Sequence, residues 1–165
     1  MKRSLVLIAA FAMWSAVSGP IGAQAPARTQ AATLPSPEAK YDPARDAAAD
    51  IRLAVAEARK SNRRVILDVG GEWCGWYHTL DRYFVDHKDL AELRDKHFVW
   101  LKVNYSQENK NEAVISTYGK ILSYPWLFVL EQDGKLLSSQ QTDPLEEGPS
   151  YNYDRMKGFL TKWIK

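Results

Sequence analysis

The sequence predicts an α/β domain in which helices cover both faces of a central mixed four-stranded sheet. Three observations support this prediction. Amphipathic helical patterns alternate with short apolar runs along the chain. Strands separated by helices favour parallel pairing through right-handed crossovers. The last two apolar runs are instead separated by residues 132–135, whose Asp133-Gly134 pair favours the positive φ of a hairpin. The final strand should therefore run antiparallel to its neighbour.

Each element is predicted from its local pattern. Ile51, Val55 and Ala58 lie at helical spacing, and Asn62 suits the end of that helix. Gly70-Gly71 ends the first apolar run, and a helix should begin near Cys74. The expected order is a helix at 46–61, a strand at 65–69, helices at 74–85 and 89–96, a strand at 98–103, a helix at 111–121, strands at 126–130 and 136–140, and a closing helix at 151–164.

The first 23 residues have the layout of a secretory signal peptide. Lys2 and Arg3 precede an apolar stretch from Ser4 to Val17, and small residues lead to a cut after Ala23. The apolar stretch is shorter than the ~20 residues that a membrane span needs. The sequence thus predicts export, to the periplasm or outside the cell, with no stable membrane span after cleavage.

Two further regions follow the predicted leader. Residues 24–45 are rich in Ala and Pro with few large apolar residues, which predicts a flexible linker. Residues 46–165 have the length and apolar content of one folded domain. The sequence predicts a single domain after the linker.

Composition excludes several kinds of site. The chain has 22 Lys and Arg against 20 Asp and Glu, and the leader holds Lys2 and Arg3 but no acidic residue, so the remainder is formally neutral. No clustered basic face indicates nucleic-acid binding. Cys74 is the only cysteine, which excludes an internal disulfide and a cysteine-based zinc site. We expect no metal and no cofactor. An odd cysteine in an exported protein is a candidate reactive or intermolecular thiol.

The residues around Cys74 carry a family resemblance. Residues 65–77 read Val-Ile-Leu-Asp-Val-Gly-Gly-Glu-Trp-Cys-Gly-Trp-Tyr, with Asp68 six residues before Cys74, and Tyr124-Pro125 precedes an apolar strand. Together with the order of elements, this resembles the thioredoxin-like family over residues 46–165, and exported members more than cytosolic thioredoxin. The resemblance implies the thioredoxin fold. The chain departs from the family at Tyr77, where the resolving cysteine should lie.

The resemblance implies a role for each residue near the sulfur. Cys74 would be the nucleophile, because a helix N-terminus stabilises an anion and the thiolate is the reactive form. Asp68 resembles the family's buried acid, which serves the resolving thiol. Without that thiol, Asp68 could act in catalysis, solvate the pocket or hydrogen-bond Tyr77. His78 could favour the thiolate or be an ordinary exposed residue.

The candidate substrate-binding residues surround the same sulfur. Trp73 and Trp76 could form an apolar platform around it. Pro125 resembles the family's cis-proline, which leaves the backbone of the preceding residue free to pair with a bound chain; an ordinary strand-entry proline is the alternative. Tyr77 either fills the pocket or hydrogen-bonds the sulfur. The full set is Trp73, Gly75, Trp76, Tyr77, Tyr124 and Pro125.

Two functions remain open from the sequence. The first is monothiol thiol–disulfide exchange, in which Cys74 forms a mixed disulfide with protein disulfides, protein thiols or small thiols, and an external thiol resolves the adduct. The second is a binding or chaperone-like module that uses the groove without turnover, or holds one partner through a stable disulfide. The retained Trp-Cys-Gly favours the first function, whereas the missing second cysteine argues against ordinary dithiol turnover.

Overall fold

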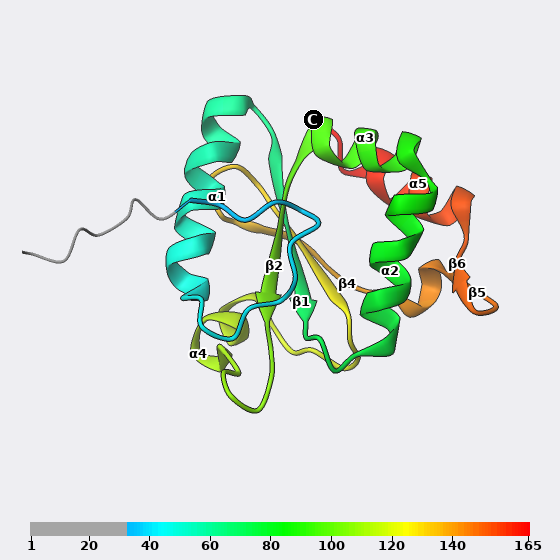
Figure 1. Ribbon diagram of the computed structural model, residues 1–165. Coiled ribbons are helices and arrows are strands. Elements are labelled where there is room, and N and C mark those ends of the chain that lie inside the picture. Colours follow the sequence, from blue (N-terminus) through cyan, green and yellow to red (C-terminus); the bar gives the residue numbers. More distant parts are fainter. Residues whose placement is uncertain (1–32) are drawn as a thin grey trace, which may run out of the picture. The chain divides into compact units, whose positions relative to one another are not determined.

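The computed structural model describes residues 33–165, so the predicted signal peptide and the first part of the linker lie outside the described residues. Four strands form one mixed sheet in the order β2-β1-β3-β4 (Figure 1). β1 (Arg64–Gly70) pairs in parallel with β2 (Phe98–Asn104) and antiparallel with β3 (Trp126–Leu130). β4 (Leu136–Gln141) pairs antiparallel with β3. The predicted α/β class with a mixed four-stranded sheet is confirmed.

The direction of β3 differs from the predicted crossover pattern. Strands that are separated by helices were expected to be parallel, but β3 is antiparallel to β1. The connection explains the difference, because α4 (Glu112–Ile115) and the 3-10 turn Ser116–Tyr118 hold only seven residues. At ~1.5–2 Å per residue this helix cannot carry the chain back along a strand of ~23 Å. The chain re-enters the sheet at the end where β2 left it.

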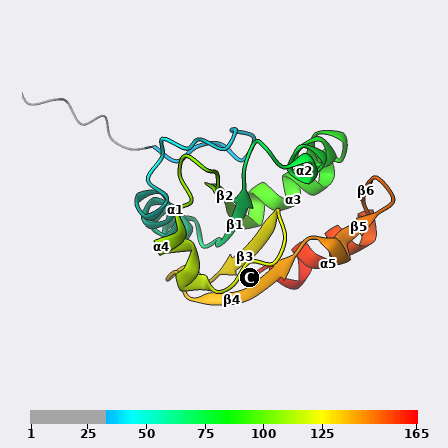
Figure 2. The same ribbon diagram turned by 90° about the horizontal axis from the view of Figure 1, so that it is seen from below.

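Helices cover both faces of the sheet. α1 (Ala47–Ser61) lies with α4 on one face, whereas α2 (Gly75–Asp86), α3 (Lys88–His97) and α5 (Tyr153–Lys162) lie on the other (Figures 1 and 2). Asp46 caps α1 by accepting from Ala49 N, and Asn62 ends it with a φ of 54°. The sequence cue at Asn62 therefore corresponds to an observed cap, whereas Asp46, predicted as the first helical residue, is the N-cap.

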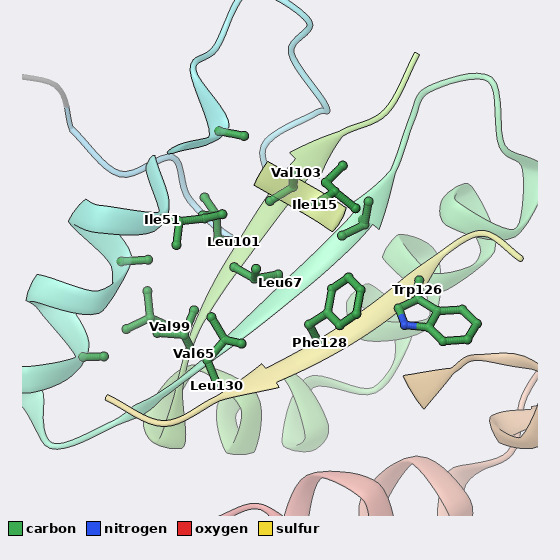
Figure 3. Close-up of a cluster of buried hydrophobic side chains, with 14 residues drawn as sticks. Ile51, Val65, Leu67, Val99, Leu101, Val103, Ile115, Trp126, Phe128 and Leu130 are labelled. Carbon is green, nitrogen blue, oxygen red and sulfur yellow. The ribbon is translucent and has the colours of Figure 1, made fainter. Parts of the chain in front are cut away.

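The alternation of side chains divides the strands between two cores. Figure 3 shows Val65 and Leu67 of β1 beside Val99 and Leu101 of β2, facing Ile51 of α1. Successive residues of a strand point to opposite faces. The residues in between therefore face α2, among them Ile66 and Trp100, which are both buried there. The polar residues Asp68 and Lys102 occupy this same phase, directly opposite each other in the β1–β2 register.

Two predicted helices are shorter than expected. The helix predicted at 111–121 ends before Gly119, whose φ of 123° is outside the helical region. The closing helix begins at Tyr153, because Asn152 caps it by accepting from Arg155 N. The residues before this cap form a small hairpin of β5 (Glu146–Glu147) and β6 (Ser150–Tyr151) around Gly148, whose φ is 59°. The hairpin was not predicted, since two-residue strands leave no alternating pattern.

The packed chain begins upstream of the predicted boundary at residue 46. Residues 33–45, here called the N-terminal segment, run along the β2 side of the sheet between α1 and α2 (Figure 2). Tyr41 is only 3% exposed. Glu38 pairs with Arg94 at 2.7 Å, and Arg45 pairs with Asp50 at 2.6 Å. The predicted flexible linker therefore does not extend through residue 45, because one buried ring and two ion pairs outweigh the polar composition.

Residues 33–165 contain neither a membrane-spanning helix nor a cluster of metal-ligating side chains. No helix in this range is long and apolar enough to cross a membrane. No group of three or more His, Cys, Asp or Glu in the same range could hold a metal ion.

Two leucines close to one another in sequence test the packing of the second core. Leu127 of β3 is fully buried, whereas Leu122 is 69% exposed. Leu127→Ala should lower the free energy of unfolding by about 2–5 kcal/mol, because it removes methyl groups and leaves a cavity. Leu122→Ala should change it by less than about 0.5 kcal/mol. Urea denaturation of both variants gives the comparison, and equal effects would contradict this placement of β3.

Candidate functional site

Cys74 lies at the N-cap of α2, where a strand ends and a helix begins. Its backbone is extended, with φ −93° and ψ 116°, and no side chain caps the first turn of the helix. The first amides of a helix have no partner within the helix and carry partial positive charge. An anion at Sγ would therefore face unpaired donors. The residue is 6% exposed, so neighbouring residues cover most of the thiol.

The indole of Trp73 is held to one side of the sulfur. Its Nε1 donates to the carbonyl oxygen of Tyr105 at 2.7 Å, and Trp73 remains 57% exposed. The ring lies over Gly71, where a Cβ atom would come within 2.4 Å of Nε1. Tyr105 N in turn donates to the Gly70 carbonyl at 2.6 Å. Glycine at position 71 is thus required by the close approach of this indole.

The other side of the sulfur is formed by the start of α2. Trp76 is half-buried and packs edge-to-face against Tyr151 at 5.7 Å between ring centroids. Gly75 is exposed, and a Cβ atom there would meet nothing within 4 Å. Open space therefore lies beside Gly75 in the first turn of α2. A bound chain could approach Cys74 there.

The Tyr124-Pro125 loop lies against Cys74. The Tyr124–Pro125 peptide bond is cis, and the Cys74 thiol donates to the carbonyl oxygen of Tyr124 at 3.4 Å. The Tyr124 ring stacks on Tyr105 at 5.0 Å and meets Trp73 edge-to-face at 5.3 Å. The structure therefore brings Trp73 and Cys74 together with Tyr124 and Pro125, which follow some 50 residues later in the sequence.

Beneath the sulfur, two tyrosine rings fill the space. Tyr77 is 1% exposed and forms a small core with Tyr41 and Cys74. The two rings meet edge-to-face at 4.5 Å. Burial, with a contribution from Asp81, raises the pKa of the Tyr77 phenol well above its usual value, so it stays neutral. Tyr77 fills the pocket, and its hydroxyl accepts from Lys102 Nζ at 3.2 Å.

Asp68 is fully buried and accepts two hydrogen bonds. Tyr41 Oη donates to Oδ1 at 2.8 Å, and Trp100 Nε1 donates to Oδ2 at 3.2 Å. Burial raises the pKa of Asp68 to about 6, although Lys102 and the Tyr41 hydroxyl lower it in part. The hydrogen-bond partner suggested from the sequence, Tyr77, is not the one observed. Tyr41 reaches the carboxyl group instead, from 27 residues upstream.

Lys102 is a buried cation on the same face of the sheet. Its Nζ pairs with Asp81 at 2.7 Å and lies 4.6 Å from the centre of the Tyr77 ring and 5.8 Å from that of Tyr41. A buried ammonium needs such partners, since an unpaired one is strongly disfavoured. The lysine thus connects the helix that carries Cys74 to the strand beside Asp68.

Sequence reasoning missed Tyr41 and Lys102. Tyr41 was assigned to the linker, and only its size among small residues could have marked it. Lys102 stands between the apolar residues Leu101 and Val103, and strand alternation placed it on the face of Asp68. His78, in contrast, is exposed and its Nε2 lies 3.0 Å from the Glu72 carbonyl oxygen, without a hydrogen bond to Cys74.

Comparisons with known proteins agree with this geometry. The profile of a family described as thioredoxin-like matches residues 46–131. A disulphide isomerase from Xylella fastidiosa Temecula1 is 24% identical with a TM-score of 0.64, covering 79% of this chain and 96% of that one. The C-terminal domain of Neisseria meningitidis DsbD, in its oxidised form, is 18% identical with a TM-score of 0.51, covering 74% and 98%. No curated protein matches in sequence. At these identities the solved structures show the fold alone, and the predicted thioredoxin fold is confirmed.

The buried carboxyl group predicts a specific pH dependence. Because its pKa is about 6 when folded against 3.8 in the unfolded reference, Asp68 favours folding most below pH ~4, and this contribution is lost as the pH rises through 6. Asp68→Asn should therefore become more stable relative to the parent by up to about 3 kcal/mol between pH 4 and 7.5. Denaturation of both proteins at each pH measures the difference.

Two further variants identify which groups hold this pKa down. Lys102→Met should raise the pKa of Asp68 more than Tyr41→Phe does, because the charge of Lys102 is the larger of the two lowering effects. The carboxyl carbon resonance of Asp68 reports the pKa directly. A pKa near 4 in the parent would contradict the observed burial.

Proposed function

The chain belongs to the thioredoxin-like family, and from this premise we propose that it is an exported monothiol thiol–disulfide exchange protein acting through Cys74. The observation that carries the proposal is the uncapped first turn of α2. Cys74 is the N-cap residue there, and no side chain accepts hydrogen bonds from the free amides of that turn. The predicted leader supports export, where protein disulfides are stable.

The proposed exchange consists of two thiolate attacks on a disulfide. The Cys74 thiolate attacks one sulfur of a client disulfide, so an S–S bond forms to Cys74 and the second client sulfur leaves as a thiolate. An external low-molecular-weight thiolate then attacks the client sulfur of this adduct, and Cys74 leaves as a thiolate. The thiol proton, held towards the Tyr124 carbonyl in the structure, passes to solvent before the attack. No net oxidation occurs.

The filled pocket explains why the second step needs another molecule. In a dithiol site the residue three positions after the nucleophile supplies the resolving sulfur. Here that position holds Tyr77, whose neutral phenol cannot attack a disulfide, and Tyr41 closes the space next to it. The same filling favours the second candidate function, a binding module that keeps one partner through a stable disulfide.

The reaction of Cys74 with oxidised glutathione tests the proposal. We expect the folded protein to gain one glutathione, faster than the urea-unfolded chain at the same pH, because only the folded state places Cys74 at the uncapped start of α2. Excess reduced thiol should release the adduct. Acid quenching and mass spectrometry follow both steps, with Cys74→Ser as the control. A folded thiol that reacts only after unfolding would exclude exchange, and an adduct that resists thiol would favour the binding module.

Replacing Tyr77 by cysteine should change the mechanism. Position 77 lies in the first turn of α2, below Cys74, so reduced Tyr77→Cys should reduce an insulin disulfide without added thiol and end as an internal disulfide, whereas the parent stops at the mixed disulfide. Tyr77→Ser creates a space of similar size without a thiol and is the matched control. Both variants should lose roughly 3–5 kcal/mol of stability, because a buried ring is removed. Equal reduction of insulin by the parent and Tyr77→Cys in the absence of added thiol would overturn this account of Tyr77.

A further inference from the structure

A cavity of about 750 Å³ opens beside Cys74, on the Trp73 side. This volume is in the range of ligand sites, ~300–1,000 Å³. Its walls come from three parts of the chain: the N-terminal segment with Tyr41 and Pro43, the turn with Trp73, and the loop that follows β2 with Tyr105. Two of these residues also border Cys74. Tyr41 belongs to the same buried cluster as Cys74, and Trp73 precedes it in the chain. The cavity therefore adjoins the residues around Cys74, whereas Tyr77, which fills the space beneath the sulfur, is not part of its lining.

The walls of this cavity are held in place by hydrogen bonds. Asn109 donates to the Pro43 carbonyl at 2.9 Å, which ties the loop after β2 to the N-terminal segment. Asn104 donates to the Asn109 carbonyl at 2.8 Å, and Trp73 donates to Tyr105 at 2.7 Å. Tyr41 N donates to a carboxylate oxygen of Glu72 at 2.9 Å. A site whose walls are already bonded loses little entropy when a ligand enters it.

The chemistry of the lining favours a cation. Aromatic faces attract an ammonium or guanidinium group, and the lining includes the aromatic residues Tyr41, Trp73 and Tyr105. Trp73, which is 57% exposed, offers the accessible ring, whereas Tyr41 is nearly fully buried. The charged lining residues are Glu72, Glu108 and Lys110, which gives an excess of negative charge. A hydrogen bond from Ser106 holds the pKa of Glu108 below its usual range, so this exposed carboxylate is charged at neutral pH. An acidic ligand would meet both carboxylates.

We propose that this cavity binds a basic side chain, arginine or lysine, that flanks the reactive cysteine of a client polypeptide. The proposal rests on the proposed function, since the client is the molecule whose sulfur joins Cys74. A guanidinium group fits best, because it stacks on aromatic rings and also pairs with a carboxylate. The cavity would thus select clients by charge, while Cys74 performs the exchange.

Two disulfide-linked peptide probes test the selection, identical except that arginine or glutamate flanks the cysteine on both sides. The parent should form the mixed disulfide about tenfold faster with the arginine probe at low salt, and the ratio should shrink as salt rises. Glu108→Gln should reduce the ratio by about two- to fivefold, and Lys110→Gln should increase it. Glu92→Gln, the same charge change on α3, should leave the ratio unaltered. Comparing ratios between variants cancels the intrinsic reactivity of each probe.

The outcomes separate this inference from the proposed function. Equal rates with both probes, or a ratio that neither Glu108→Gln nor Lys110→Gln changes, would overturn the cavity proposal while leaving exchange at Cys74 intact. If neither probe reacts, exchange at Cys74 fails, and binding is then measured without it. In Cys74→Ser, serine versions of the peptides are titrated while the Trp73 indole N–H resonance is followed. A shift with the arginine peptide alone supports the cavity site, and equal responses to the two peptides refute it.

Discussion

The hydrogen bond from Tyr41 to Asp68 is the constraint on which the arrangement of the site depends. Strand alternation directs Asp68 under α2, and a carboxyl group buried there must find donors or stay protonated. Trp100, on the neighbouring strand, supplies one donor, and Tyr41 supplies the other from outside the sheet. To reach it, the N-terminal segment has to pack along β2. The ion pair of Glu38 with Arg94 holds the same segment from a second point. A buried acid in β1 thereby orders a segment whose composition alone would leave it flexible.

The same contact decides what the sulfur can do. The Tyr41 ring packs on Tyr77, and the Tyr77 hydroxyl accepts from Lys102, so the space below Cys74 is closed by two rings and a buried cation. This leaves the chemistry above the sulfur, where the α2 amides, the Tyr124 carbonyl and the Trp73 indole lie. In the proposed exchange, a thiol in such a place accepts a client sulfur but has no internal partner to displace it. Tyr77, which occupies the position of the second cysteine, and Tyr41 fill the space below Cys74 together, so the two substituents of this pocket depend on each other.

The fold followed from the sequence wherever local pattern decided the outcome. β3 was located residue for residue at 126–130, and Asn62 marked the end of α1, because caps and apolar runs act over a few positions. Cys74, Trp73 and Tyr124-Pro125 could be grouped only through the family resemblance. What was missed depends on contacts between distant residues. Tyr41 and Asp68 are 27 positions apart, and Lys102 and Asp81 are 21 apart, so no window of sequence contains either pair. The direction of β3 was missed for a local reason. It depends on the length of α4, which is shorter than the predicted helix at 111–121.

Tyr41 has three simultaneous contacts, so different substitutions at this position remove different sets of contacts. Its hydroxyl donates to Asp68, one side of its ring packs on Tyr77, and the residue also lines the cavity beside Trp73. Tyr41→Phe removes the first contact alone, whereas a smaller residue removes all three and leaves the N-terminal segment held only by its ion pairs and hydrogen bonds. Two of the three charged residues of the cavity have no such multiple roles, because Glu108 and Lys110 are exposed and neither contacts the buried acid. Substitutions at those two positions alter the charge that a client meets while the packing beneath Cys74 stays as it is. Client selection and sulfur chemistry are therefore separable at the rim of the cavity, although they share a residue at its base.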